Sequence, residues 1–256
     1  MQARFQGVSF VHGVVAGSGG IWVVRGGVTR IDPGTGEVRD VPHVAGMGLF
    51  QIAAGAHAVW AVDGGSNEIL RIDQRYVKVA ARIRVPGRAW GIAAGTRQIL
   101  VLSVPHAGPV TGPIGARLLR RVDPKSNRLS LSRARLQCDA GVSVGFSAVW
   151  TLDACNGSLS RRDLRTLQVQ RARKLRVLSQ TPALGFGSVW LAGRSGVRRI
   201  DPSTLRTVAL IRARSSIVVV GDGAVWALDP PHNVLRKIDP RTNRVVGRPV
   251  VIPTTS

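Results

Sequence analysis

Gly221–Thr242, GDGAVWALDPPHNVLRKIDPRT, is the clearest copy of a pattern that occurs six times in this chain of 256 residues. In each copy a glycine lies five positions before a tryptophan or the leucine that replaces it. A basic–apolar–Asp turn follows in five copies, and in the fourth copy Arg162 takes the apolar place. The tryptophan position holds Trp22, Trp60, Leu100, Trp150, Trp190 and Trp226. The glycine position holds Gly17, Gly55, Gly95, Gly145, Gly185 and Gly221, and the turn position holds Asp32, Asp73, Asp123, Asp163, Asp201 and Asp239. Self-similarity at a period of roughly 40 residues indicates a repeat fold.

Alternation of apolar and polar residues predicts four strands in the sixth copy, at 216–220, 224–228, 234–238 and 243–249. We expect residues 221–223 to form the first turn, where a positive φ favours glycine, and this need would explain the unbroken glycine position. Asp239 and Pro240 predict the last turn, because an aspartate at its first position accepts from the N–H two residues on and proline presets φ.

Four-stranded units at this period pack as the blades of a β-propeller. We therefore predict an all-β, single-domain propeller over residues 1–256, with each tryptophan buried between neighbouring blades. Six blades are expected, at approximately 13–42, 49–85, 88–136, 141–177, 182–212 and 215–251. Residues 4–10 align with a fourth strand, which either pairs where the ring closes or is the remnant of a seven-bladed parent.

The chain is strongly basic, with 36 Lys and Arg against 14 Asp and Glu and a net charge of +22. A surplus of this size attracts polyanions, but we interpret most of it as a generally basic surface. One cluster belongs to blade four: Arg133, Arg135, Arg161, Arg162, Arg165, Arg171, Arg173, Lys174 and Arg176. The cluster could contact phosphates, although it lacks the aromatic residues that stack on exposed bases.

A second basic position lies two residues before each turn aspartate: Arg30, Arg71, Arg121, Arg161, Arg199 and Lys237. We interpret it as structural, because a long arginine stem can cover apolar surface at the edge of a blade while its head stays hydrated.

The pattern Gly-x-x-x-x-Trp followed by Arg/Lys-Ile/Val-Asp-Pro-x-Ser/Thr resembles the YVTN-type and streptogramin-lyase-like bacterial propeller families over residues 13–251. The resemblance implies the propeller fold, and such families include an antibiotic-linearising lyase, DNA-binding propellers and extracytoplasmic binding modules. The resemblance implies that such lyases use a metal held with carboxylates. It also implies that they use His and Glu residues near the central channel. The only glutamates here, Glu37 and Glu68, fall at a turn and on an outer strand, so no catalytic or metal-binding residue is carried over.

In a propeller, the loops joining second to third strands and fourth to first strands emerge on one face, here called the channel-mouth face. We place His12, His43, His106 and His232 there, together with Asp63, Asp139, Asp153 and Asp229. No His-x-His spacing exists, so exposed loop histidines are favoured over a metal site. For Asp63, Asp153 and Asp229, whose hairpins contain Asn67, Asn156 and Asn233, turn chemistry is favoured over a ligand-binding triad.

Arg88 and Trp90 open the first strand of blade three and are expected to point toward the central channel. The loop between the second and third strands of this blade, residues 103–117, is rich in Pro and Gly and is expected to shape the channel mouth. A cation next to an aromatic ring suits an anionic or planar ligand. Together with the four histidines, these two residues form our set of candidate ligand-binding residues.

Cys138 and Cys155 lie in two loops that reach the same face of blade four. A disulfide between them is therefore expected, with two unpaired thiols as the alternative. A disulfide favours an oxidising compartment, in which case the export signal is missing from this chain; otherwise the protein is cytoplasmic. The start of the chain lacks the layout of a signal peptide.

These residues predict a monomeric, non-catalytic propeller that binds a small molecule or a protein at the channel-mouth face and uses no cofactor. One alternative is a lyase or hydrolase related to the streptogramin lyases, which would require a divalent metal. A second alternative is a propeller that binds DNA or another polyanion. No run of 18 apolar residues is present, so no membrane span is expected.

Overall fold

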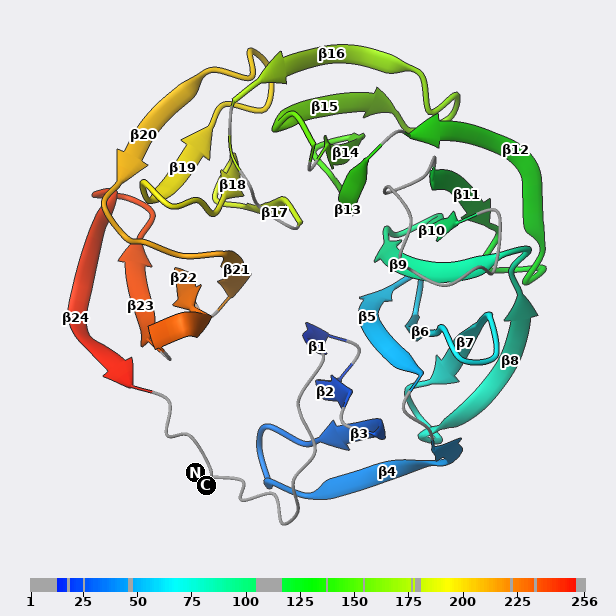
Figure 1. The fold of residues 1–256 in the computed structure, drawn as a ribbon. Helices are drawn as coiled ribbons and strands as arrows, with labels where there is room; N and C mark the ends of the chain where they lie inside the picture. Colours follow the sequence, from blue (N-terminus) through cyan, green and yellow to red (C-terminus); the bar gives the residue numbers. More distant parts are fainter. Residues whose placement is uncertain are drawn as a thin grey trace. The chain divides into compact units, whose positions relative to one another are not determined.

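A computed structural model describes residues 13–251 except 18, 25, 46–47, 105–116, 137, 154, 176, 178–180, 222 and 233. Of residues 43, 45, 49, 50, 131–133, 135, 139, 140 and 230 it describes the backbone only. The chain divides into two compact units, Met1–Gln137 and Cys138–Ser256. Each unit contains three of the six four-stranded antiparallel sheets, and the fold is a six-bladed β-propeller, as predicted (Figure 1). The expected strand at residues 4–10 lies outside the described residues.

The first unit holds blades one to three, each a meander with its strands in chain order. Blade one consists of β1 (Gly13–Gly17), β2 (Gly20–Val24), β3 (Gly27–Ile31) and β4 (Val38–Ala45). Blade two consists of β5 (Leu49–Gly55), β6 (Ala58–Asp63), β7 (Glu68–Asp73) and β8 (Lys78–Arg84). Blade three consists of β9 (Arg88–Ala94), β10 (Ile99–Val104), β11 (Arg117–Val122) and β12 (Leu129–Leu136).

The second unit holds blades four to six, with the same strand order. Blade four consists of β13 (Asp139–Gly145), β14 (Ala148–Asp153), β15 (Ser158–Asp163) and β16 (Val169–Lys174). Blade five consists of β17 (Ala183–Gly185), β18 (Ser188–Leu191), β19 (Val197–Ile200) and β20 (Thr207–Ile211). Blade six consists of β21 (Ile217–Gly221), β22 (Ala224–Asp229), the 3₁₀-helix η1 (Pro230–His232), β23 (Val234–Asp239) and β24 (Arg244–Val251). The strands predicted for blade six agree within one or two residues.

Four of the five repeat tryptophans are buried between neighbouring blades, as predicted, whereas Trp226 of blade six is only partly buried. Trp22, Trp60, Trp150 and Trp190 are fully buried, and each packs against the next blade of its own unit. Trp60, for example, lies in one cluster with Ile99 and Val101 of blade three. Leu100, which replaces tryptophan in blade three, is also fully buried. These contacts supply the cover that a single blade cannot provide for its own faces.

The positive φ expected from the sequence does not explain most of the glycines at the repeated position. Among these glycines only Gly17 has a φ in the left-handed region, at 143°. The positive φ values of the first turn fall on later residues: Gly19, Ala56, His57, Phe146, Ser147, Phe186, Gly187 and Gly223. A Cβ at Gly55 would instead lie 2.8 Å from the Cβ of Ala94 in the next blade. Close approach of adjacent first strands therefore excludes a side chain here.

The glycine carbonyl has a second role, because it accepts a hydrogen bond from the indole five residues later. The Nε1–O distance is 3.0 Å for Trp60–Gly55 and Trp150–Gly145. It is 3.0 Å for Trp190–Gly185 and 3.2 Å for Trp226–Gly221. The repeated Gly-x-x-x-x-Trp pattern is thus a local hydrogen-bonded unit that satisfies a buried indole N–H.

The turn aspartates make the bonds predicted from sequence. The Asp163 carboxylate accepts from the backbone N–H of Arg165 and Thr166 at 2.8 and 2.7 Å. The turn closes through a bond from the Leu167 N–H to the Asp163 carbonyl, with Leu167 at φ 61°. In blade five, hydrogen bonds from the Ser203 hydroxyl, then from the Thr204 N–H and hydroxyl, lower the pKa of Asp201 to about 2.

The basic position has a structural role at Arg71 and Arg199, but their guanidiniums bind the next blade instead of staying hydrated as expected. Each cation lies directly across the sheet from the tryptophan or Leu100 of its blade. The Arg199 guanidinium lies 5.3 Å from the Trp190 ring and donates to the Pro240 carbonyl and to Asn243 Oδ1 of blade six, at 2.8 and 3.0 Å. Arg71 similarly donates to Asn127 Oδ1 of blade three, at 3.2 Å. These arginines therefore join adjacent blades within a unit.

Candidate functional site

Blade three carries a cluster of two arginines and one tryptophan, here called the Arg88–Trp90–Arg117 cluster. Arg88 and Trp90 alternate with the buried Ala89 along β9, so both lie on the same, partly exposed side of the strand. Arg117 begins β11, two strands away in the same sheet. The guanidinium carbons of Arg88 and Arg117 lie 6.0 and 5.2 Å from the centre of the Trp90 ring. Two cations thus share one indole.

The register of the sheet creates this cluster. Val104 of β10 pairs with Arg88, and Ser103 pairs with both Ala89 and Leu118. Arg117 therefore lies at the same end of the sheet as Arg88. This is the end at which β10 finishes and β11 begins. Nearby, Gln51 Oε1 of blade two accepts from the Ile92 N–H at 3.2 Å, which ties β9 to β5.

This arrangement combines full positive charge with a flat apolar surface. A guanidinium is planar, keeps its charge and matches carboxylate or phosphate oxygens, while the indole can stack on a ring. The cluster is therefore suited to a small planar anion.

The described histidines do not converge. His12 and His106 lie outside the described residues, and of His43 only the backbone, in β4, is described. His232 ends η1, with its Nδ1 2.9 Å from Asp229 Oδ2. The Asp229 side chain is 6% exposed and the His232 side chain 56% exposed, so a buried carboxylate orients an exposed imidazole. With a proton on Nδ1, this histidine presents its Nε2 as a base or ligand.

Asp63 and Asp153 have the turn role predicted for them. Asp63 accepts from the N–H of Gly65 and Ser66, and Asp153 from those of Cys155 and Asn156. Asp229 differs from these two aspartates, because the hydrogen bond described for its carboxylate is with the His232 ring. The side chain of Asp139 lies outside the described residues.

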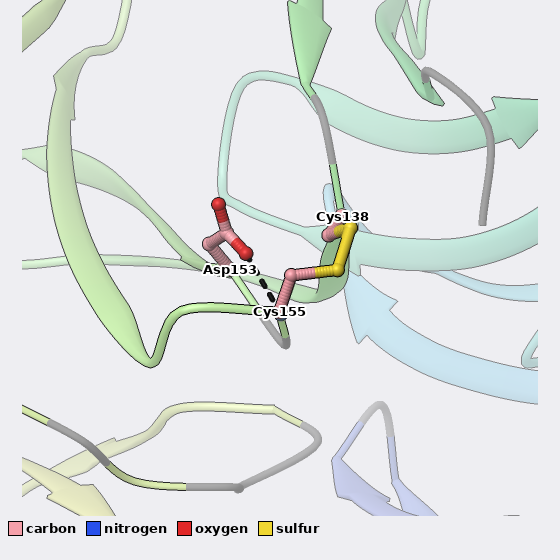
Figure 2. Close-up of side chains that lie close together, drawn as sticks. All are labelled: Cys138, Asp153 and Cys155. Atoms are coloured by element: carbon pink, nitrogen blue, oxygen red, sulfur yellow. Dashed lines mark hydrogen bonds between the residues drawn. A yellow bond between two sulfur atoms is a disulfide. The ribbon is translucent and has the colours of Figure 1, made fainter. Parts of the chain in front are cut away.

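Cys138 and Cys155 form the predicted disulfide, with their Cα atoms 5.7 Å apart (Figure 2). Asp153 lies beside it, and its carboxylate accepts from the Cys155 N–H at 2.8 Å. The ligand atoms of these three residues all lie within 4.8 Å of one another. Bonded sulfurs are not thiolates, so the cluster is not a thiolate metal site in this state.

The basic surface of blade four centres on β16, whose six residues are all exposed. Arg171 lies directly across from Arg161 of β15. Like charges that face each other across a sheet are unfavourable, and an anion would relieve that repulsion. The side chains of Arg133 and Arg135 and all of Arg176 lie outside the described residues.

A shallow groove of about 550 Å³ also lies on the outer strands of the first unit. Pro42 of β4 and residues 78–82 of β8 line it. Its lining contains none of the candidate ligand-binding residues, and we assign it no role.

Sequence reasoning missed Arg117 and the partner of His232. Arg117 could have been found by pairing the strands on either side of the loop in blade three, because that register returns it to the level of Arg88. Asp229 could have been found as the partner of His232 from their separation of three residues.

The described part of the chain contains no helix of the length and hydrophobicity that a membrane crossing needs.

Several solved structures resemble this chain in fold. They include a streptogramin B lyase, with 14% identity, a TM-score of 0.70 and coverage of 96% of this chain and 84% of that one. A chain of a mitotic checkpoint complex has 11% identity, a TM-score of 0.68 and coverage of 90% and 76%. The computationally designed protein Ika8 has 10% identity, a TM-score of 0.62 and coverage of 94% and 87%. No protein-family model and no curated protein matches the sequence. At these identities the likeness shows the fold alone.

Proposed function

We propose that this protein is a non-catalytic binding module that holds a small planar anion at the Arg88–Trp90–Arg117 cluster, on the channel-mouth face. The observation that carries the proposal is the position of the Arg88 and Arg117 guanidiniums, 6.0 and 5.2 Å from the Trp90 ring. An anion there would gain charge-assisted hydrogen bonds and a stacking surface.

The roles of the repeated residues support a binding function over catalysis. The glycines, tryptophans, turn aspartates and basic residues of the repeat pack blades or close turns. The Arg88–Trp90–Arg117 cluster is outside this repeated set, because only blade three has these residues at these positions. The propeller then acts as a rigid scaffold that presents one distinctive edge.

Titration with 2-naphthoate, followed by tryptophan fluorescence, tests the proposal. Arg117→Ala should weaken binding about tenfold or more, since a hydrogen bond to a charged group contributes about 1.5–3 kcal/mol. Arg171→Ala removes an equal charge from β16 and should leave the affinity unchanged. Naphthalene-2-methanol, which has the ring without the charge, should bind much more weakly. Equal effects of the two arginine variants would refute the assignment.

We also propose an extracytoplasmic location, supported by the disulfide, because such bonds persist in oxidising compartments. Alkylation of free thiols in intact producing cells, before and after reduction, tests this. A fully alkylated, reduced Cys138 in those cells would contradict it.

A lyase is the second candidate, supported by the fold likeness to the streptogramin B lyase and by the His232–Asp229 pair. A reaction of this kind would need a divalent metal, and the described residues supply only His232 as a histidine ligand side chain near Asp229. Turnover of a cyclic lactone that depends on added Mg²⁺ and is lost in His232→Ala would favour this candidate over a binding module.

Polyanion binding through β16 is the third candidate, supported by its exposed Arg171, Arg173 and Lys174. Any protein of charge +22 binds DNA in a salt-dependent manner. The informative comparison is therefore Arg171→Ala/Arg173→Ala against a double variant of two arginines elsewhere, such as Arg206→Ala/Arg212→Ala. A selective loss in the first variant supports the β16 surface.

A further inference from the structure

The disulfide and its neighbouring carboxylate have the composition of a metal site. The two sulfurs and an Asp153 oxygen all lie within 4.8 Å of one another (Figure 2). Cys138 and Asp153 are partly exposed and Cys155 is exposed, so both a reductant and an ion can reach them. The cluster belongs entirely to blade four.

The backbone near these residues is also held by strand pairing and hydrogen bonds that do not involve sulfur. Asp139, the residue after Cys138, pairs with Asp153 at the edge of β13 and β14. The turn that carries Cys155 is closed by a bond from the Gly157 N–H to the Asp153 carbonyl at 2.8 Å. Gly157 in turn accepts from the Leu175 N–H at 2.9 Å. After reduction, the two thiols would therefore remain next to each other.

Asp153 is held in place by the same turn. Its Oδ1 accepts from the N–H of Cys155 and Asn156 at 2.8 and 3.2 Å, and its Oδ2 accepts from the Asn156 amide at 2.9 Å. An ionised carboxylate has about four lone-pair positions, so one remains for a cation.

We propose that reduction of Cys138–Cys155 converts this cluster into a site for one thiophilic divalent cation, Zn²⁺ or Co²⁺, held by both thiolates and the Asp153 carboxylate. A dithiol reductant gives up two hydrogens, becomes a disulfide and leaves two cysteine thiols. The cation then replaces the two thiol protons, which are released to solvent. A water molecule completes the tetrahedral set that such ions prefer.

The chemistry makes the site conditional on redox state. Thiolates are soft ligands that select zinc-like ions, whereas a disulfide offers no anionic sulfur. The redox conditions of the compartment therefore determine whether the two cysteines form a disulfide or bind a metal ion. This inference is independent of the ligand proposed for blade three.

Cobalt titration of the full chain tests the site. The protein is reduced with a phosphine, which takes up the oxygen of water and does not compete as a dithiol would. Reduced protein should bind one Co²⁺ per chain, with a thiolate-to-cobalt charge-transfer band and the visible bands of tetrahedral Co²⁺, and Zn²⁺ should displace it. Oxidised protein should show no such bands. Their absence from the folded, reduced protein would overturn the proposal.

Two aspartate variants show whether the carboxylate is a ligand. Asp153→Asn should keep the turn bonds, because an amide oxygen also accepts from backbone N–H groups, but its Co²⁺ affinity should fall roughly tenfold or more. Asp63→Asn is the matched control, since Asp63 makes the same turn bonds in blade two without cysteines nearby, and its affinity should not change. Equal affinity in the Asp153→Asn variant and the parent protein would overturn the three-ligand site.

Thermal unfolding separates binding to the folded site from binding to an unfolded chain. A ligand that binds only the native state raises the melting temperature. Zn²⁺ should therefore raise the melting temperature of the reduced protein and not that of its Cys155→Ser variant. An unchanged or lowered melting temperature of the reduced protein would count against the proposal.

Discussion

Replacing the repeated glycine by alanine should destabilise blade two more than blade four. Gly55 and Gly145 occupy the same position of the repeat, and each accepts the indole N–H of its own tryptophan at 3.0 Å. Neither has a positive φ, so an alanine causes no local backbone strain at either site. The two differ in what a Cβ would meet.

At Gly55 a Cβ would lie 2.8 Å from both the Ala94 Cβ and the Gly95 carbonyl oxygen. These atoms belong to the last residue of β9 and to the residue after it, and they can move only with the backbone. At Gly145 the nearest atom, also at 2.8 Å, is Cδ1 of Leu184, and the next lies at 3.8 Å. A leucine tip can move aside by a change of rotamer, so the second site should accommodate the methyl group.

Overpacking costs about 1–3 kcal/mol, against about 0.4–1 kcal/mol gained because alanine restricts the unfolded chain. We therefore expect Gly55→Ala to lower the free energy of unfolding by about 1–2 kcal/mol and Gly145→Ala by less than about 0.5 kcal/mol. Urea denaturation followed by tryptophan fluorescence measures both, provided that the m-value stays unchanged. Equal losses, or a larger loss for Gly145→Ala, would refute the argument from close strand approach.

Three further predictions concern other contacts of the repeat. Trp60→Phe should cost about 1 kcal/mol more than Trp22→Phe in urea denaturation, because Trp60 loses its bond to Gly55, whereas the Trp22 indole N–H is buried without a partner among the described residues. A double-mutant cycle of Arg199→Met and Asn243→Ala should give a coupling of about 0.5–1.5 kcal/mol, and a coupling near zero would remove Arg199 as a link between blades. Acid should destabilise the protein as the pH falls from about 4 towards about 2, since the folded state lowers the pKa of Asp201 to about 2. The contribution of this carboxylate is complete above its unfolded pKa and is lost as it protonates, so Asp201→Asn should flatten the decline in melting temperature over that interval.

The fold was predictable because its determinants are local and repeated. Strand alternation, a turn aspartate and the glycine–tryptophan spacing each act within a few residues of chain, and six copies reinforce one another. The reason for glycine at position 55 was not predictable, since it depends on how closely the chain at β5 approaches β9 and Gly95. A neighbouring strand, and not a local φ, excludes the side chain at Gly55.

The candidate sites also contain some contacts that the sequence predicted and some that it did not. Cys138 and Cys155 could be paired from sequence because both loops were assigned to one face of one blade. Arg88 and Trp90 were identified as a possible contact for an anion, but Arg117 was not, because a long loop separates it from them along the chain.

By itself the sequence determined six four-stranded blades, their turns and the buried tryptophans, since these follow from spacing and side-chain type. Only the tertiary structure decided that Arg117 shares the Trp90 ring, that Asp229 orients His232 and that Asp153 lies beside the disulfide. The physical reason is that strand register and turn closure bring these side chains together, and neither can be measured along the chain alone.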